Sequence, residues 1–436
     1  MEPLFLAVIC GCNAGLFRKA LHEVYIPRIQ RGNASFAVKV LGARGALLAV
    51  LVHFFEHGRW GSLVRNGAQG QNLTAEDQLF VLAQAGLYLT ATRGLAAPEA
   101  RTCYEQAEPL CHSLDRPLLL YSALIGRWRY CSQADKLTTA LRLAKRVYAL
   151  AEQQNNPALM IGAYRALAIT RFYLGNFEAA RQYARRGVQL WRSGDVQSPV
   201  EEVHAPAVIC LCFEALSAWH LGEISSGHAS MAEAISLANE LSDAHALAQA
   251  LYLSLMLGYY ERNCSEVERL ASDLIELSTR QTFAFYLPVL EILRGWVRSV
   301  SGDALEGLAS IEDGIRRIRM TDSMLTLPYW LAIKAEALDR VDRASEALQA
   351  ISEAQALVER YEERAWAAEL HRLRAVFLAA LGAEETQIED SFQEAIKIAK
   401  EQKSVSLEKR AEATYAEYRR QKASRSGGRG FRLPLW

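Results

Sequence analysis

The chain has 436 residues, of which 51% are hydrophobic, enough to build a sizeable core. Its 49 Lys and Arg residues balance 49 Asp and Glu residues, so the formal net charge is zero. Proteins that grip nucleic acid without sequence specificity usually carry a basic excess that neutralises phosphates, so we expect no nucleic-acid partner.

Two apolar runs near the N-terminus, residues 4–12 and 46–55, raise the question of a membrane segment. Both are far shorter than the roughly 18–20 residues that a helix needs to span a bilayer. The eight cysteines are scattered and form no C-x-x-C pair, which favours reduced thiols over a disulfide framework or a zinc site. We therefore predict a cytoplasmic protein with no membrane partner.

The two ends of the chain differ in pattern from its middle. Residues 1–72 are rich in glycine and contain no clean repeat unit, so we predict a cap or a remnant of another domain there. Residues 423–436 are rich in Ser, Gly and Arg and are predicted to be disordered. The segment between them, residues 73–422, is predicted to be a repeat array.

The repeat array is visible in the spacing of the breaks between its apolar helices. The intervals between successive breaks are 40, 47, 40, 40, 40 and 41 residues, with a longer loop over residues 193–206 in the second interval. Such regularity is typical of stacked helical repeats. The breaks begin at Asp135, Gly175, Gly222, Arg262, Gly302, Asp342 and Ala383.

Small residues recur where the two helices of one unit must approach closely. Ala168 and Ala180 flank one break, and Gly295 and Gly307 take the same places three units later. The spacing alone favours HEAT repeats, but this small-residue ladder favours a tetratricopeptide-like unit with lengthened helices. We predict an all-α fold: a right-handed α-solenoid of tetratricopeptide-like helix–turn–helix repeats with a period of about 40 residues.

Several short blocks, in a fixed order, carry a family resemblance over roughly residues 75–420. They are residues 91–99, 283–286 with 293–296, 328–331, 363–373 (ERAWAAELHRL), 391–396 and 404–410. In these blocks the array resembles the C-terminal repeat region of bacterial multidomain adenylate/guanylate cyclase–predicted ATPase signalling proteins. It is also similar to the tail of maltose-regulator-type transcription activators. One family block departs from the pattern at residues 204–207, which read His-Ala-Pro-Ala.

The catalytic parts of that family have no counterpart in this sequence. No Gly-x4-Gly-Lys-Ser/Thr run is present to cradle a phosphate. His53 and His57 have the spacing of two zinc ligands, but Phe54 stands where a zinc protease has Glu. We therefore predict no catalytic site, no cofactor and no bound metal, and we do not expect an enzyme.

In solenoids of this kind the first helices of the units line an extended concave surface that binds partners. Aromatic and arginine side chains there are suited to anchor a peptide or a partner helix. For any single ring the alternative, packing in the core, is favoured, and each arginine has the alternative of a solvated charge. The candidate partner-binding residues are Arg129, Arg165, Trp219, Tyr252, Tyr259, Tyr260, Trp296 and Arg340.

Architecture and resemblance together predict a protein–protein interaction scaffold or regulatory repeat module in bacterial signal transduction. The expected partner is a protein or peptide segment, and the resemblance adds a cyclase/ATPase module as a candidate. One alternative is a regulatory domain that senses a small molecule. The other is a fragment of a larger cyclase/ATPase protein that lacks the catalytic domains.

Overall fold

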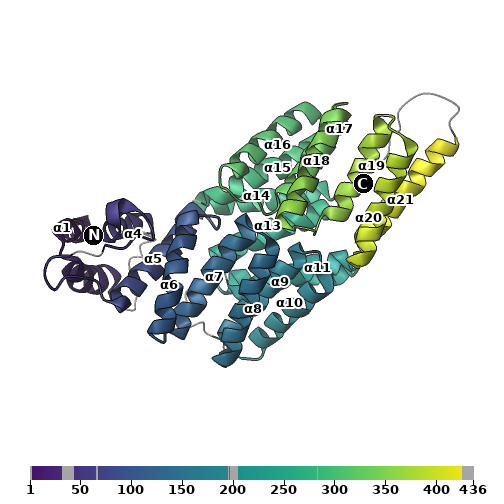
Figure 1. The fold of residues 1–436 in the computed structure, drawn as a ribbon. Helices are drawn as coiled ribbons and strands as arrows, with labels where there is room; N and C mark the ends of the chain where they lie inside the picture. The colour runs from purple at the N-terminus through teal and green to yellow at the C-terminus, as the bar shows by residue number, and fades with distance from the viewer. Residues whose placement is uncertain are drawn as a thin grey trace. The chain divides into compact units, whose positions relative to one another are not determined.

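The computed structural model describes residues 2–31, 44–64, 67–194, 196, 205–281 and 283–424 (Figure 1). Residues 425–436 of the predicted C-terminal tail, and His204 of the block at residues 204–207, therefore lie outside the described residues. The described chain forms two compact units. The first holds residues 2–133 and 146–155, and the second holds the other described residues.

The first unit combines short helical segments with longer paired helices. Thr74 caps the N-terminus of the first longer helix, α5, with a capping box. Its hydroxyl accepts a hydrogen bond from Asp77 N–H, and the Asp77 carboxylate accepts one from Thr74 N–H. The helical segments are α1 (Glu2–Asn13), α2 (Phe17–Lys19), η1 (Ala20–Gln30), α4 (Arg44–Leu51), η3 (Val52–Phe54), η4 (Glu56–Gly58), α5 (Ala75–Arg93), α6 (Pro98–Ser113) and α7 (Pro117–Ala134). Helix α8 (Leu137–Gln153) contributes residues to both units.

The second unit is a stack of antiparallel helix pairs, in which each helix packs on its partner and on the next pair. Asn176 and Asp243 cap two of these helices by accepting hydrogen bonds from Ala179 N–H and Ala246 N–H. The pairs are α9 (Pro157–Tyr173) with α10 (Phe177–Arg192), α11 (Pro206–His220) with α12 (Ile224–Glu240), α13 (Ala244–Tyr260) with α14 (Cys264–Gln281), α15 (Leu287–Ser301, preceded by η5, Ala284–Tyr286) with α16 (Ala304–Arg319), α17 (Leu327–Arg340) with α18 (Ala344–Tyr361), and α19 (Ala367–Ala380) with α20 (Glu385–Glu401), followed by α21 (Val405–Ala423).

The predicted fold class, an all-α solenoid of tetratricopeptide-like repeats, is confirmed. All seven predicted breaks fall in turns between the two helices of a pair. In the described residues, the only extended pairing besides these helices is an isolated antiparallel bridge between Phe55 and Leu63. None of the described helices is long and apolar enough to cross a membrane.

Each break from Gly175 onward contains a residue in the left-handed region of the backbone map. Glycine, which adopts this conformation without steric cost, supplies it at Gly175, Gly222, Gly302 and Gly382. Arg262 takes the same place between α13 and α14 with φ 58°. A non-glycine residue is destabilised in this conformation, so the presence of an arginine at this position needs a structural explanation.

The small-residue ladder is present where the helices of a pair cross. A Cβ atom added at Gly307 would lie 2.4 Å from the carbonyl oxygen of Gly295, and one added at Gly295 would lie 2.7 Å from that of Gly307. Ala168 and Ala180 are fully buried at the equivalent places in an earlier pair. Close backbone approach therefore requires glycine at Gly295 and Gly307, and the Ala168–Ala180 crossing accommodates only small side chains.

Candidate functional site

The first helices of the second unit end against a segment that lies about two hundred residues later in the chain. The last carbonyl groups of an α-helix have no partner inside the helix and need one from elsewhere. At the end of α9, the carbonyl of Tyr173 accepts hydrogen bonds from the backbone N–H groups of Arg364 (2.7 Å) and Ala365 (3.1 Å). The turn before α19 thus caps the C-terminus of α9.

The next two first helices are capped in the same way. The carbonyl of Trp219, near the end of α11, accepts a hydrogen bond from the Ser406 hydroxyl of α21. The carbonyl of Tyr260, at the end of α13, accepts one from the guanidinium group of Arg410, also in α21. The array therefore closes on itself along a line that we call the closing seam: the C-terminal ends of α9, α11 and α13 with residues 362–366 and 402–410.

Aromatic rings fill the interior beside the closing seam. Tyr260 stacks on Trp366 with ring centroids 4.7 Å apart, and Phe177 stacks on His220 at 3.7 Å. His220 Nδ1 lies 2.9 Å from the hydroxyl of Ser404, within hydrogen-bond distance. Because burial lowers the pKa of His220 well below its usual range, its ring is neutral and packs as an aromatic residue.

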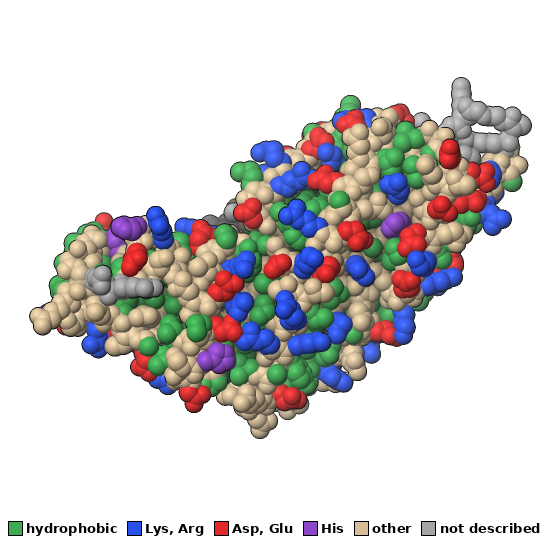
Figure 2. Space-filling model, viewed as in Figure 1, with side chains coloured by type: hydrophobic (Ala, Val, Ile, Leu, Met, Phe, Trp, Pro, Cys, Tyr) green, Lys and Arg blue, Asp and Glu red, His purple; other side chains and the backbone are tan. Residues whose placement is uncertain are grey.

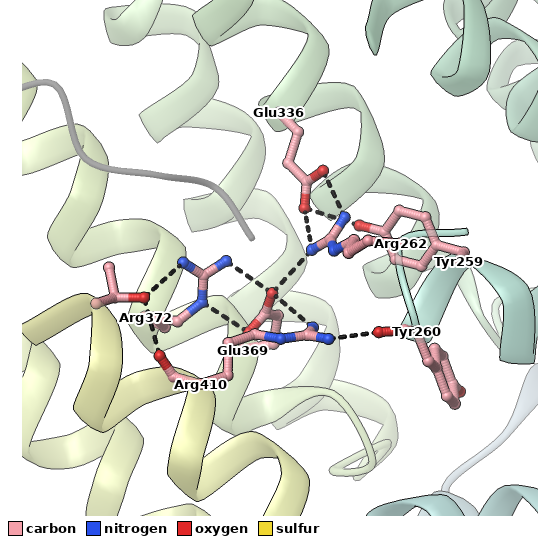
Figure 3. A network of polar contacts seen from close by, with 8 residues as sticks. Tyr259, Tyr260, Arg262, Glu336, Glu369, Arg372 and Arg410 are labelled. Atoms are coloured by element: carbon pink, nitrogen blue, oxygen red, sulfur yellow. Dashed lines mark hydrogen bonds and ion pairs between the residues drawn. The ribbon is translucent and has the colours of Figure 1, made fainter. Parts of the chain in front are cut away.

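A network of charged side chains lies beside these rings (Figure 3). Arg262 reaches from its turn to Glu336 of α17, with N–O distances of 2.7 and 2.8 Å, and to Glu369 of α19 at 3.2 Å. Arg372 forms a bidentate pair with Glu369, both distances being 2.8 Å, and Arg410 approaches the same carboxylate at 3.3 Å. Four helices or turns that are distant in sequence are thereby joined.

Burial and pairing oppose each other in this network. Burial favours the protonated form of Glu369, but the guanidinium groups of Arg372, Arg410 and Arg262 outweigh it and hold the pKa of Glu369 well below its usual range. Arg262 is likewise buried, and the carboxylate of Glu336 raises its pKa above the usual value. Arg262 and Glu369 are thus held in their charged forms, and the ion pairs of Arg262 give a reason for an arginine at a left-handed turn position that is glycine in most of the other repeats.

The structure places the predicted partner-binding residues inside the molecule. Exposed rings on a concave face were expected, but the last repeats cover the inner ends of the first helices, so all five rings are at most 8% exposed. The core interpretation therefore describes where these rings lie, and partner binding through them stays a prediction. The buried residues are Trp219, Tyr252, Tyr259, Tyr260, Trp296, Arg129 and Arg165, while Arg340 is half-buried.

Of these residues, Trp219, Tyr259, Tyr260 and Trp296 belong to one aromatic cluster. Tyr259 contacts Trp296 with ring centroids 5.0 Å apart, and Trp219 contacts Tyr260 at 4.9 Å. Tyr259 also donates a hydrogen bond of 2.8 Å to Glu336, which connects the cluster to the charged network. These residues therefore hold repeats together.

One accessible feature of the closing seam is a cavity of 590 Å³, which we call the seam cavity. Its lining comes from the turn between α9 and α10 and from α18, α19 and α20. Leu174, Leu370 and Ile398 supply apolar surface, whereas Glu359 and Glu401 supply exposed carboxylates. A concave site that mixes apolar walls with a few polar groups is the usual form of a ligand-binding pocket.

Sequence reasoning missed the seam cavity because its walls come from repeats that are far apart in the chain. The one available signal was the block at residues 363–373, which contributes Arg364, Ala367, Leu370 and His371 to the lining. Among the residues that the structure describes, no three His, Cys, Asp or Glu side chains are grouped as metal ligands would be.

Comparisons with known proteins agree with the fold. No family model matches the chain. An uncharacterized protein of Rhizobium meliloti (strain 1021) is 23% identical over 379 residues, which are 86% of this chain and 36% of that protein. The chain thus spans about a third of the length of this relative.

Two solved structures resemble the chain at low sequence identity. A Rap protein complexed with competence and sporulation factor aligns with a TM-score of 0.50 and 11% identity, over 80% of this chain and 98% of that chain. The human IFIT1 dimer with m7Gppp-AAAA aligns with a TM-score of 0.49 and 12% identity, over 90% of this chain and 81% of that chain. At such identities the likeness concerns the fold alone.

Replacement of Arg262 tests whether the charged network holds the second unit together. Arg262→Gly relieves the left-handed backbone but removes the guanidinium partner of the fully buried Glu336 carboxylate, which keeps the hydrogen bond from Tyr259. We expect a net loss of about 3 kcal/mol in the free energy of unfolding, measured by urea denaturation, because breaking a buried pair costs more than the turn gains.

Ser242→Gly is the matched control, because Ser242 also has a left-handed φ of 52° but is exposed in the turn between α12 and α13. This variant should be neutral or slightly more stable than the unchanged protein. Equal effects of the two replacements would contradict a special role for Arg262.

Because of Glu363, which lies in the closing seam, we expect the stability of the protein to depend on pH. Its carboxyl is 3% exposed and accepts a hydrogen bond of 2.9 Å from Thr326 N–H, and burial raises its pKa to about 8. Because the folded-state pKa exceeds the unfolded value of about 4.3, its contribution to stability is complete below about pH 4.3 and is lost as the pH rises to about 8.

Glu363→Gln should therefore raise the melting temperature at about pH 8 and flatten its decline between about pH 5 and about pH 8. Glu362→Gln is the control: although burial opposes it, hydrogen bonding to Thr138 lowers the pKa of Glu362, so its removal should not stabilise at high pH. An unchanged pH profile for Glu363→Gln would show that this carboxyl does not titrate in the folded protein.

Proposed function

We propose that this chain is a protein-interaction repeat module that binds a protein or peptide segment at the seam cavity and acts in bacterial signal transduction. The cavity is the observation that carries the proposal, because its 590 Å³ are accessible while the aromatic residues of the first helices are buried. Tetratricopeptide-like arrays commonly present concave surfaces to partners. The similar Rap structure is itself a complex with competence and sporulation factor, which supports a peptide-like occupant.

The setting of this module is proposed from the family resemblance. The relative from Rhizobium meliloti is a bacterial protein, and 36% of its length corresponds to this chain. This leaves room there for the additional domains that the resemblance to cyclase–ATPase proteins implies. We therefore propose a regulatory role in the bacterial cytoplasm, with a cyclase/ATPase module as a candidate partner or as part of a longer relative.

A second candidate function is the sensing of a small molecule. The volume of the seam cavity falls within the roughly 300–1,000 Å³ of typical ligand pockets, which favours this alternative. A panel of metabolites screened for an increase in melting temperature separates the two. A stabilising metabolite that competes with bound peptide would favour the sensor.

The proposal is tested by selecting peptides from a random displayed library on the purified full chain and then blocking the seam cavity. Gln355 lines the cavity on α18, so Gln355→Trp should fill part of it and weaken binding of the selected peptides by about tenfold or more. The neighbouring Ala356 is exposed and does not line the cavity, so Ala356→Trp serves as the matched control and should bind normally. Peptides that bind both variants equally would contradict binding in the seam cavity.

A further inference from the structure

The seam cavity adjoins a second hollow that lies over α10. This hollow has a volume of 870 Å³, and we call it the α10 groove. The two hollows share three lining residues, Asn176, Glu178 and Lys403. Lys403 and Glu178 form an ion pair with an N–O distance of 2.6 Å, so one salt bridge borders both hollows.

The ionisable groups that line only the seam cavity and those that line only the α10 groove differ in the sign of their net charge. In the seam cavity three carboxylates, those of Glu359, Glu394 and Glu401, face one guanidinium, that of Arg364. Burial lowers the pKa of His371, the remaining titratable group of the lining, so its ring adds no positive charge at neutral pH. The seam cavity is therefore acidic.

The α10 groove has the opposite balance. Three guanidinium groups, those of Arg181, Arg185 and Arg186, accompany one carboxylate, that of Glu223. Arg181 is bound to Glu223 by a bidentate pair, and Arg185 lies 2.8 Å from Glu214. With Arg181 and Arg185 paired, Arg186 leaves the groove with a net positive charge, whereas on the face that Figure 2 shows charges of the two signs are interspersed.

On both sides of the shared salt bridge some charges have no counterion. Glu359 and Glu401 in the cavity form no ion pair within 4.0 Å in the described part of the chain, and neither does Arg186 in the groove. All three side chains belong to exposed residues. An incoming partner can thus pair with them without first breaking an existing salt bridge.

Resting on the function proposed above, we infer that the occupant is an extended protein segment with separated charges. Its basic side chains enter the seam cavity and pair with Glu359 and Glu401, and its acidic side chains lie in the α10 groove beside Arg186. A segment suits the site better than a small molecule, because each hollow alone has the volume of a typical ligand pocket. Complementary charge of this kind sets specificity and the association rate more than raw affinity.

The probe is a fluorescein-labelled peptide with two Lys residues, a short Gly-Ser spacer and two Glu residues, and anisotropy gives its dissociation constant. We compare it with a peptide of the same composition in which Lys and Glu alternate, and with all-Lys and all-Glu peptides. The segregated peptide should bind about five- to tenfold more tightly than the alternating one, because each exposed ion pair adds modestly. This preference should shrink as salt is added.

Charge reversals in the protein test which half of the peptide binds in the seam cavity and which in the α10 groove. Glu401→Lys should weaken the segregated and all-Lys peptides, and Arg186→Glu should weaken the segregated and all-Glu peptides. Asp390→Lys on α20 and Arg142→Glu on α8 are controls, because these exposed residues line neither hollow. All of these sites are exposed, so the variants should melt normally, which the same samples verify.

The outcomes separate this inference from the function on which it rests. One outcome is that Gln355→Trp weakens binding of the selected peptides while both charge reversals leave their affinity unchanged. In that case the seam cavity binds segments, but the inference of a charge-separated occupant is wrong. If the alternating and segregated peptides bind equally, the inference fails as well. If Gln355→Trp has no effect on selected peptides, the proposed function itself fails.

Discussion

Carbonyl groups at the C-terminal ends of three helices accept hydrogen bonds from distant segments and set the main constraint on the second unit; that of Trp219 also accepts one from Gly222 N–H in its own turn. A helix C-terminus that is buried needs hydrogen-bond donors from outside the helix. For α9, α11 and α13 these donors come from the turn before α19 and from α21, as the hydrogen bonds to Tyr173, Trp219 and Tyr260 show. The last repeats are therefore part of the core of the earlier ones.

This closure departs from the usual behaviour of repeat proteins. In a simple solenoid each repeat contacts only its neighbours, so that stability is a sum of local terms. Here the pairs that join Arg262 to Glu336 and to Glu369, and the hydrogen bond from Arg410 to the Tyr260 carbonyl, link repeats that are not sequence neighbours. The second unit should consequently unfold as one cooperative block, and its interior is occupied by side chains where an open array would present a binding surface.

Closure also explains where an accessible site remains. Because Trp366, Tyr260 and the charged network fill the interior, a partner of the kind proposed would meet the array at the seam itself. The seam cavity and the α10 groove lie on the two sides of the Lys403–Glu178 salt bridge. Binding there would engage residues from both ends of the second unit at once.

The periodic features of the fold were readable from the sequence. The breaks at Gly175 and Gly222 and the small pair Gly295 and Gly307 are local or recur at a fixed interval, so spacing reveals them. Arg262 at a position that is otherwise mostly glycine was also a visible signal, although it did not identify its partner.

The closing seam was not readable from the sequence. Ser406 and Trp219 are nearly two hundred residues apart, and no periodicity relates them. The aromatic residues lie on the first helices of their pairs, as expected, but whether that face is open or filled depends on the superhelical path of the whole array. For the same reason the cavity residues could not be brought together in advance.

Closure in solution is tested most directly by a disulfide across the seam. A Cβ atom added at Gly222 would lie 3.2 Å from the Cβ of Val405, close to the separation of about 3.8 Å in disulfides. The double variant Gly222→Cys with Val405→Cys should form the cross-link on mild oxidation, identified by mass spectrometry of the joined peptides. Gly302→Cys with Val405→Cys is the control, because Gly302 occupies the equivalent turn but has no atom near its added Cβ. An absent cross-link in the first variant, or equal cross-linking in both, would contradict a closed array.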